Sequence, residues 1–553
     1  MTQILIHYSR RTILFVIALL LTATLSLAQT PPSDSDTVLK AMQDELARSI
    51  DKLVIQGQEK PYFIEYEMMD VQSFNVTAAF GGLLYAQRNR GRIATVDVRV
   101  GGYDFDNEPT GYPMQVAIED DYNALRHELW LATDSAYRAA VEQIARKRAF
   151  LKNRTEDEKI PDFSKEDPTI LLLPKQALSF DQKAWENQVR ELSAIFRQFP
   201  NIKQSGVTMN VQLVHRYLVN SEGSKIRRPS LLITLEASGQ TQAADGMWLG
   251  HSAPFYATSF EQLPSTAEMT KAVKTMAEEL TKLQTAPTLN ENYLGPVLFA
   301  GPASAEMFSQ LLASEFCSSR PPVGMSGEDR SELANRLNRR VLPFHISIYD
   351  DPTQEKFGDK SLLGSYKVDD QGVAARKISL VEQGVLKTLL LSRRPRKNML
   401  KSNGHGRSGL NGGASTEIGN LFIQSSEGKS YDQLKQELIK SCKALELPYG
   451  IIIKGGGLGD PNPIYKIYVA DGREELIRGA STGELTVKQL KAQIIAVGND
   501  SYVLNRAGGG GYGGGGISAS IVAPSVLIEE LELKKPTGTQ QKPMILTHPY
   551  FDR

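Results

Sequence analysis

Residues 295–306 read Gly-Pro-Val-Leu-Phe-Ala-Gly-Pro-Ala-Ser-Ala-Glu, and this stretch decides how the chain is organised. An apolar run leads to Pro302, which suits the first turn of a helix because its fixed φ is already helical and its missing N–H would have no helical partner there. We expect a helix near Glu306–Phe316. A polar linker just before the stretch, Thr285–Asn292, contains Pro287 and marks the main domain boundary.

The sequence pattern changes at this boundary. Beyond the linker, glycine turns separate short strands, and a second helix is expected near Tyr431–Leu445. Before the linker, amphipathic helices alternate with extended segments. The fold class is therefore α+β, with a mixed α/β N-terminal half followed by a β-rich C-terminal half. We expect an N-terminal α+β domain over 29–286, as one unit or two subdomains, a C-terminal domain over 287–535 and a polar tail over 536–553.

Hydrophobic periodicity predicts the elements of the N-terminal half. Between Leu39 and Leu53, apolar residues recur at intervals of three and four, which is typical of an amphipathic helix over 37–56. Strict alternation over Ile93–Val100 indicates a strand with one solvated face. Further helices are expected over 124–152, over 181–197 and after the capping box Ser265-x-x-Glu268, and further strands over 62–66 and within 207–260.

Several blocks of the C-terminal half share their order and spacing with one known family. They are Asp369–Val373, Ile378–Lys387, Ser402–Arg407, Ile418–Ile423 and Val522–Ile528. Together with residues 295–306 and the segment 73–100, they resemble the TldD/PmbA metalloprotease family over most of 37–535. The resemblance implies a two-domain α+β fold, pairing of two related chains around an enclosed cavity, and hydrolysis of peptides or unfolded polypeptide. In that family one chain of the pair usually holds the metal.

The metal motif of that family is absent from this chain. Catalytic members carry His-Glu-x-x-x-His on a helix that follows the apolar run, and on that pattern the histidines fall at Ala300 and Ala305 and the glutamate at Gly301. A catalytic zinc needs three protein ligands, an open position for water and a nearby carboxylate as base. We therefore expect no metal and no cofactor in this chain, with zinc only in a catalytic partner.

The resemblance and the missing motif predict a metal-free partner subunit of a peptide-hydrolysing complex. The expected partners are a catalytic TldD-like relative and a peptide or unfolded polypeptide substrate. Glu306, His405 and Arg407 are candidate contacts to the peptide or to the partner. Two alternatives stay open: an active metallopeptidase with a non-standard site built from His405, His345 or Glu306, and a stand-alone extracytoplasmic peptide-binding protein. Whether the chain is itself an enzyme is left open with them.

The first 28 residues have the pattern of a secretion signal. Arg10 and Arg11 precede the apolar run Thr12–Leu25, and Ser26-Leu27-Ala28 is a small-x-small cleavage sequence. We expect cleavage after Ala28 and export to the periplasm or the cell exterior, by either the general or the twin-arginine route. The apolar run is shorter than the roughly 20 residues that span a bilayer, so no membrane span is expected after cleavage.

The charge balance argues against a nucleic-acid partner. The chain has 63 Lys and Arg residues against 63 Asp and Glu residues, whereas binding to nucleic acid requires a basic face. The basic cluster Arg393–Lys397 is short and isolated, and we expect it to be a solvated loop.

The chain has two cysteines, Cys317 and Cys442. Two are too few for a disulfide scaffold or a zinc ribbon. In an oxidising compartment they can pair, but their sequence positions do not bring them together, so the pairing stays open.

Overall fold

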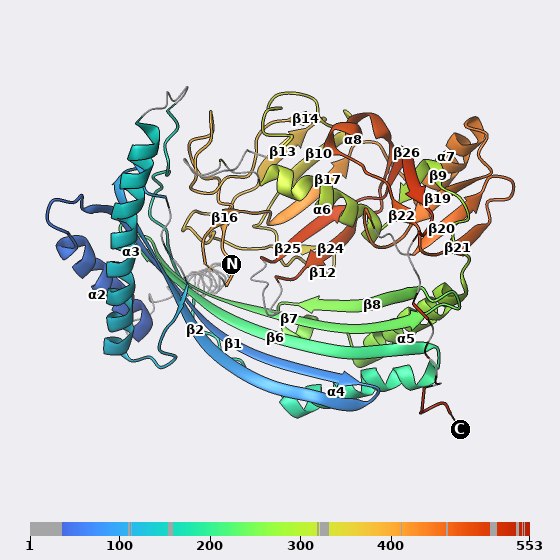
Figure 1. Ribbon diagram of the computed structural model, residues 1–553, viewed down its shortest axis with the longest axis horizontal. Coiled ribbons are helices and arrows are strands. Elements are labelled where there is room, and N and C mark those ends of the chain that lie inside the picture. The colour runs from blue at the N-terminus through green and yellow to red at the C-terminus, as the bar shows by residue number, and fades with distance from the viewer. Residues whose placement is uncertain are drawn as a thin grey trace, which may run out of the picture.

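A computed structural model describes residues 36–552 apart from 109–110, 112, 153–158, 318–319, 321–330, 411, 460–462, 509–516, 538–540, 543, 545 and 547. The predicted signal segment 1–28 lies outside the described residues. Figure 1 shows a long curved sheet built by the first half of the chain, with the second half seated on its concave side. Helices and strands are both abundant, and the predicted α+β class is confirmed.

The curved sheet has four long strands and four shorter ones. The long strands are β1 Pro61–Ala79, β2 Gly82–Gly102, β6 Ile202–Asn220 and β7 Lys225–Gln242. The shorter strands are β3 Phe105–Asp106, β4 Met114–Gln115, β5 Ile170–Leu172 and β8 Trp248–Ala257. The order is β3-β2-β1-β6-β7-β5, with β4 on β2 and β8 on β7. All pairs are antiparallel except β5 with β7.

The predicted strands 62–66 and 93–100 lie within β1 and β2, but the structure extends both. Strands β1 and β2 pair from Pro61 opposite Val100 to Ala79 opposite Gly82, with a register shift near each end. Most residues of β2 between 84 and 90 are exposed, so this part of the strand shows no apolar alternation. Pairing with β1, rather than burial of one face, makes it a strand, and alternation alone therefore underestimates its length.

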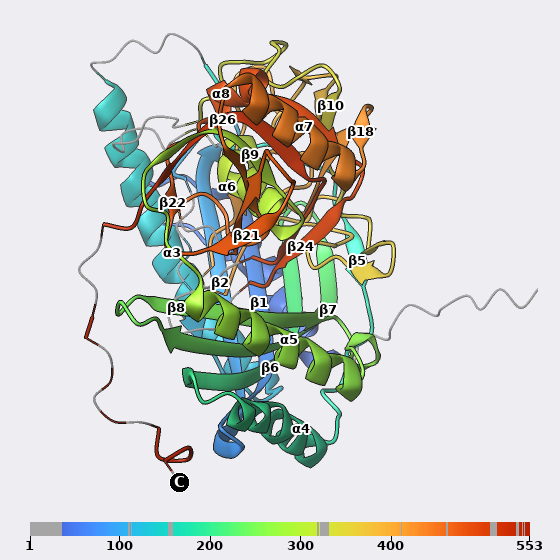
Figure 2. The same cartoon turned by 90° about the vertical axis from the view of Figure 1, so that its right-hand side faces the viewer.

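Two helices cover the convex face of the curved sheet. Helix α4, Gln182–Ala194, continues into the 3₁₀ turn Ile195–Gln198, and α5 spans Thr266–Thr285. They lie side by side on the face turned away from the second half (Figure 1, Figure 2). Their apolar faces bury Val189 of α4 and Leu280 of α5 in one cluster with Phe74, Val211 and Leu235 of the sheet. A short 3₁₀ turn, Phe260–Gln262, precedes α5.

The other end of the sheet is covered by α2, Thr37–Lys52, and α3, Tyr122–Leu151. Met42, Leu129 and Tyr137 from these helices pack against Tyr66 and Val96 of β1 and β2. Both helices agree with the predicted spans to within a few residues at each end.

Helix α5 begins with the predicted capping box. Ser265 Oγ accepts the Glu268 N–H at 3.3 Å, and Glu268 Oε2 accepts the Ser265 N–H at 2.8 Å. Replacing Ser265 by alanine should lower the free energy of unfolding by about 1 kcal/mol, because an N–H of the first turn loses its acceptor. Ser265→Thr keeps an acceptor and should cost clearly less. Denaturant titration of both variants checks this, and equal losses would contradict it.

The second half contains two larger sheets. The first has the order β14-β13-β10-β17-β25-β24, with bounds Val385–Leu386, Ile378–Glu382, Ile346–Asp350, Asn420–Ser425, Ala519–Ala523 and Tyr502–Arg506. The second has the order β18-β23-β26-β9-β19-β20-β21, with bounds Gly428–Lys429, Ile494–Gly498, Val526–Lys534, Tyr293–Phe299, Tyr449–Ile453, Ile464–Tyr468 and Glu474–Ile477. Short strands complete the half: β22 Ser481–Thr482 on β26, and the pairs β11 Lys356–Phe357 with β12 Lys360–Ser361 and β15 Gly406–Arg407 with β16 Ser415–Thr416.

Helix α6, Pro302–Phe316, joins these two sheets. It packs against β24 and β25 of one sheet and β9 of the other. Its residues Met307, Phe308, Leu312 and Phe316 lie in the largest buried cluster of the second half, with Phe299 of β9. Helix α7, Tyr431–Ala444, covers β9, β19 and β23. The last helix, α8 Val487–Gln493, was not predicted, because its seven residues are too few to show a helical period.

Both cysteines are free thiols in this structure. Cys442 is buried on α7, and burial raises the pKa of its thiol to about 11. Cys317 follows α6 and is partly exposed. Neither is therefore part of a disulfide here.

The described part of the predicted tail 536–553 returns to the curved sheet. Trp248 Nε1 donates to Gln541 Oε1 at 2.9 Å, and the Phe80 ring lies 5.1 Å from the Tyr550 ring. Among the described residues, no helix combines the length and the apolar character that crossing a bilayer requires.

Candidate functional site

The stretch 295–306 forms a strand, a sharp corner and the start of a helix. Strand β9 ends at Phe299, and Gly301 takes φ +54° to turn the chain into α6 at Pro302. That φ lies in the left-handed region, which glycine adopts without steric cost. The Gly301 N–H donates to Ser525 Oγ at 3.2 Å, and Ser304 Oγ donates to the Pro524 carbonyl at 2.6 Å. These bonds hold the start of α6 against the corner between β25 and β26.

The structure corrects the register in which the metal motif was placed. Ala300 and Gly301 lie before α6, and only Ala305 lies on it, where it is buried. A motif that needs both histidines on one helix therefore cannot start at Ala300. The absence of metal ligands holds in any register, because Pro302–Phe316 contains no histidine and no cysteine.

Zinc, which the family resemblance implies for a catalytic chain, does not fit the residues that the structure describes. In that part of the chain, no three or more His, Cys, Asp or Glu side chains are grouped so that they could hold a metal ion. His405, His345 and Glu306, named as a non-standard site, form no such group. Zinc catalysis requires three protein ligands, so no step through a metal is derived for this chain.

Glu306 lies on the first turns of α6 and is already paired. Its Oε1 accepts from Arg506 Nη2 of β24 at 2.5 Å and from Gln310 Nε2 at 3.2 Å. Both side chains of the ion pair are partly exposed. The pair is accessible to a partner chain, and the role of Glu306 as a contact stays a prediction.

His405 is a buried residue that links two segments of the second half by hydrogen bonds, and it does not lie at the surface. Its side chain is fully buried, its Nε2 lies 3.0 Å from Asp350 Oδ1, and its Nδ1 lies 3.1 Å from the Asn403 carbonyl oxygen. Asp350 also accepts the Gly419 N–H. Because both ring nitrogens have partners and no side-chain atom reaches solvent, direct contact between His405 and a peptide requires the loop to open.

Arg407 lies on the wall of a cavity between the two halves of the chain. The cavity has a volume of about 480 Å³. It is lined by residues of β6 and β7 and by segments 355–365 and 407–410. Figure 1 shows the second half of the chain on the concave side of these two strands. A cavity of this size is in the range of small-ligand sites.

Three arginines meet around one carboxylate in this cavity. Arg228 Nη2 donates to Asp370 Oδ1, Arg407 Nε donates to Asp370 Oδ2 at 3.2 Å, and Arg216 Nε lies 3.4 Å from Asp370 Oδ1. The Ser408 N–H also donates to Asp370, at 2.8 Å. Arg216 makes a second ion pair with Glu67 of β1.

The cluster depends on Asp370 for its stability. Arg216 and Arg228 are directly opposite each other on β6 and β7, a placement that is unfavourable for like charges. Burial alone would raise the pKa of Asp370, but the charges of Arg216, Arg228 and Arg407 hold it well below its usual range. Asp370 is therefore ionised across the physiological range and neutralises part of the positive charge.

A second ionic network joins the halves around Arg393. The solvated-loop prediction for Arg393–Lys397 is wrong for Arg393, which is buried, whereas Lys397 is exposed. Arg393 is 1% exposed. Its Nη2 donates to the Ser164 carbonyl at 2.6 Å and to Glu222 Oε1 at 2.7 Å, and its guanidinium lies 4.0 Å from the centre of the Phe163 ring. These partners come from the first half of the chain, so the sequence around Arg393 gives no sign of them.

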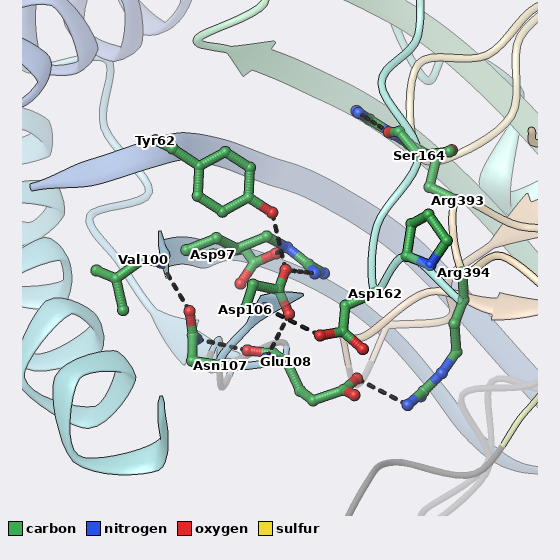
Figure 3. Close-up of polar contacts among 12 residues, drawn as sticks. Tyr62, Asp97, Val100, Asp106, Asn107, Glu108, Asp162, Ser164, Arg393 and Arg394 are labelled. Atoms are coloured by element: carbon green, nitrogen blue, oxygen red, sulfur yellow. Dashed lines mark hydrogen bonds and ion pairs between the residues drawn. The ribbon is translucent and has the colours of Figure 1, made fainter. Parts of the chain in front are cut away.

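Further polar contacts lie near Arg393. Figure 3 shows Arg394 paired with Glu108, and Asp106 beside Tyr62 and Asp162. Arg394 Nη2 donates to Glu108 Oε2 at 2.7 Å, and Tyr62 OH donates to Asp106 Oδ2 at 2.8 Å. The Arg394–Glu108 pair joins the two halves, whereas the Tyr62–Asp106 and Asp106–Asp162 contacts lie within the first half.

Glu65 on β1 gives this network a pH dependence. Burial raises the pKa of Glu65 to about 7, although the charge of Arg393 opposes the shift. The folded state then holds more protons than the unfolded state between about pH 4.5 and 7, so this group destabilises the fold as pH rises through that window. Glu65→Gln should be more stable than the wild type by about 2 kcal/mol at pH 8 and no more stable below about pH 4.5. Denaturant titrations at both pH values check this, and a pH-independent difference would contradict it.

A family model matches the second half of the chain. Residues 292–535 match the PmbA/TldA metallopeptidase C-terminal domain. A metalloprotease of Methanothermobacter thermautotrophicus is 24% identical over 286 residues, which are 51% of this chain and 59% of that protein. A metalloprotease of Archaeoglobus fulgidus is 33% identical over 131 residues, which are 24% of this chain and 27% of that protein. The chain thus matches between about a quarter and three-fifths of the length of these relatives.

Solved structures share the fold over nearly the whole described chain. TldE from Thermococcus kodakarensis has a TM-score of 0.57 at 15% identity, covering 89% of this chain and 100% of that one. A protein of Thermotoga maritima described as a modulator of a DNA gyrase has a TM-score of 0.58 at 17% identity, covering 89% of this chain and 99% of that one. At these identities the likeness concerns the fold alone.

Proposed function

Through its C-terminal domain the chain belongs to the TldD/PmbA metallopeptidase family, and from this premise we propose that it is the metal-free subunit of a peptide-hydrolysing complex. The catalytic metal would be held by a histidine-bearing relative. This chain would contribute the second wall of the chamber in which the peptide is held.

One observation carries the proposal. Helix α6 follows β9 as the family's metal helix follows its apolar run, yet it contains no histidine and no cysteine over its whole length. A chain that keeps the scaffold of a metal site without its ligands has a role if it completes the site of another chain. Glu306 on that helix forms an ion pair with Arg506 of β24.

We also propose that the complex works outside the cytoplasm. The support is the sequence pattern of residues 1–28, with cleavage after Ala28. Terminal sequencing of native protein would give Gln29 as the first residue, and an intact Met1 in a membrane fraction would contradict export by cleavage.

Co-expression with a histidine-bearing relative from the same host tests the assembly. Size-exclusion chromatography with light scattering should show one stable species containing both chains, because obligate interfaces of this kind bury on the order of 2,000 Å² or more. The control is each chain expressed alone. If this chain stays a monomer and does not associate with the relative, the partner proposal fails and a stand-alone peptide-binding protein is favoured.

A further inference from the structure

The arginine cavity between β6, β7 and the 407–410 segment carries more positive charge than its own carboxylates neutralise. Arg216, Arg228 and Arg407 supply three positive charges. Asp370 and Glu67, which pair with them, supply two negative charges. Lys356 and Glu355, also on the wall, cancel each other. The arginines and the two carboxylates that pair with them sum to one positive charge, and the neighbouring Asp369 carboxylate accepts backbone N–H groups instead of an arginine.

The hydrogen-bonding capacity of the cluster is also incompletely used. Arg228 Nε and Arg407 Nη1 are buried and have no hydrogen-bond partner among the described residues. A buried donor without an acceptor is costly, more so when it belongs to a charged group. Burial lowers the pKa of Arg216 to about 10, and the charges of Arg228 and Arg407 act in the same direction. An added carboxylate would relieve the charge repulsion among the three arginines.

The remaining wall indicates what would carry this carboxylate. Val214 and Leu232 from the sheet, and Leu362, Leu363 and Leu410 from the opposite segments, supply an apolar side. A volume of about 480 Å³ leaves room for a short organic group rather than a bare ion. The guanidinium fork matches a carboxylate through two parallel N–H donors, which makes arginine well suited to this group.

We propose that Arg228 and Arg407, with Arg216 behind them, bind the carboxylate of a peptide, and that the apolar wall receives a neighbouring aliphatic side chain. The choice of a peptide rests on the proposed function, whereas the choice of a carboxylate rests on the cavity itself. The carboxylate has two possible sources, the C-terminus of the peptide and an acidic side chain. The C-terminus is the expected source because it places a carboxylate next to the last side chain.

Fluorescence anisotropy with the purified mature chain tests this site. The probes are three N-terminally labelled hexapeptides: one ending in leucine with a free carboxylate, the same peptide as the C-terminal amide, and an amidated peptide with an internal glutamate. The free acid should bind at least tenfold more tightly than the plain amide. Arg228→Gln and Arg407→Gln should each weaken binding of the acid at least tenfold and leave the amide unchanged.

Matched variants keep the test decisive. Arg138→Gln removes an exposed arginine of α3 whose ion pair, among the residues that the structure describes, is with Asp134 four residues earlier, and it should leave all affinities unchanged. Arg228→Lys and Arg407→Lys keep the charge and lose the fork, so they should show intermediate losses and remain usable if a glutamine variant fails to fold. Tighter binding of the internal-glutamate peptide than of the free acid would support carboxylate binding with a side chain as its source.

Equal binding of all three peptides, or an acid preference that survives both arginine substitutions, would overturn the proposal. Failure here is separable from failure of the partner proposal. Assembly with the relative is measured by chromatography without peptide, and carboxylate binding is measured on this chain alone.

Discussion

Replacing Arg393 by methionine is expected to lower the free energy of unfolding by about 3–5 kcal/mol, the cost of removing one partner from a buried ion pair. Arg393 is almost completely buried, and its guanidinium reaches Ser164 and Glu222 from the first half of the chain. Methionine fills most of the space but donates no hydrogen bond. Glu222 and the Ser164 carbonyl would then lose a donor at the interface between the halves.

Denaturant titration of Arg393→Met against the wild type measures this loss. Arg138→Met is the matched control, because the Arg138–Asp134 pair on α3 is exposed and exposed ion pairs add little to stability. A loss of stability no larger than that of the control would show that the Arg393 network is dispensable.

The second large effect concerns activity. Hydrolysis of a quenched fluorescent peptide should appear when this chain and a histidine-bearing relative are combined, and replacing a metal-binding histidine of the relative should reduce it at least about a thousandfold. Glu306→Gln in this chain should change the rate less than about twofold, because Glu306 would be a wall residue paired with Arg506 rather than a proton carrier.

The controls are each chain alone and the mixture with a chelator. Chelator-sensitive hydrolysis by this chain alone would favour the alternative of an active peptidase with a non-standard site. A mixture that assembles but hydrolyses nothing would separate the assembly proposal from the catalytic one.

The helices of this protein are predictable from local sequence, whereas the lengths of its strands are not. The apolar periodicity of 37–56 and the capping box at Ser265 identify α2 and α5 because each signal lies within one or two turns. The exposed part of β2 has no local signal, since it becomes a strand only by pairing with β1. The register of the metal motif is corrected for a different reason: Pro302 already indicates the first helical turn in the sequence, and a first histidine at Ala300 would lie before that turn.

The residues of the arginine cavity are only partly predictable from the sequence. The sequence predicts Arg407 as a contact, and Asp370 lies in the segment Asp369–Val373, but the sequence pattern assigns no role to Arg216 or Arg228. The only sign of Arg216 and Arg228 in the sequence is that each is a charged residue within a strand-rich segment. Both lie on the face of the sheet that the second half of the chain covers. Arg393 had no such signal, because its partners lie 171 and 229 residues away in the chain. Sites assembled between distant segments depend on the tertiary fold.

Metal content tests the central claim most directly. Elemental analysis should be made on this chain purified alone without chelators, and on its complex with the histidine-bearing relative. The account predicts no stoichiometric zinc in this chain alone, since α6 offers no histidine or cysteine, and about one zinc per complex, lost when the relative's histidines are replaced. About one zinc per molecule of this chain alone, lost on replacing His405 or His345, would contradict it.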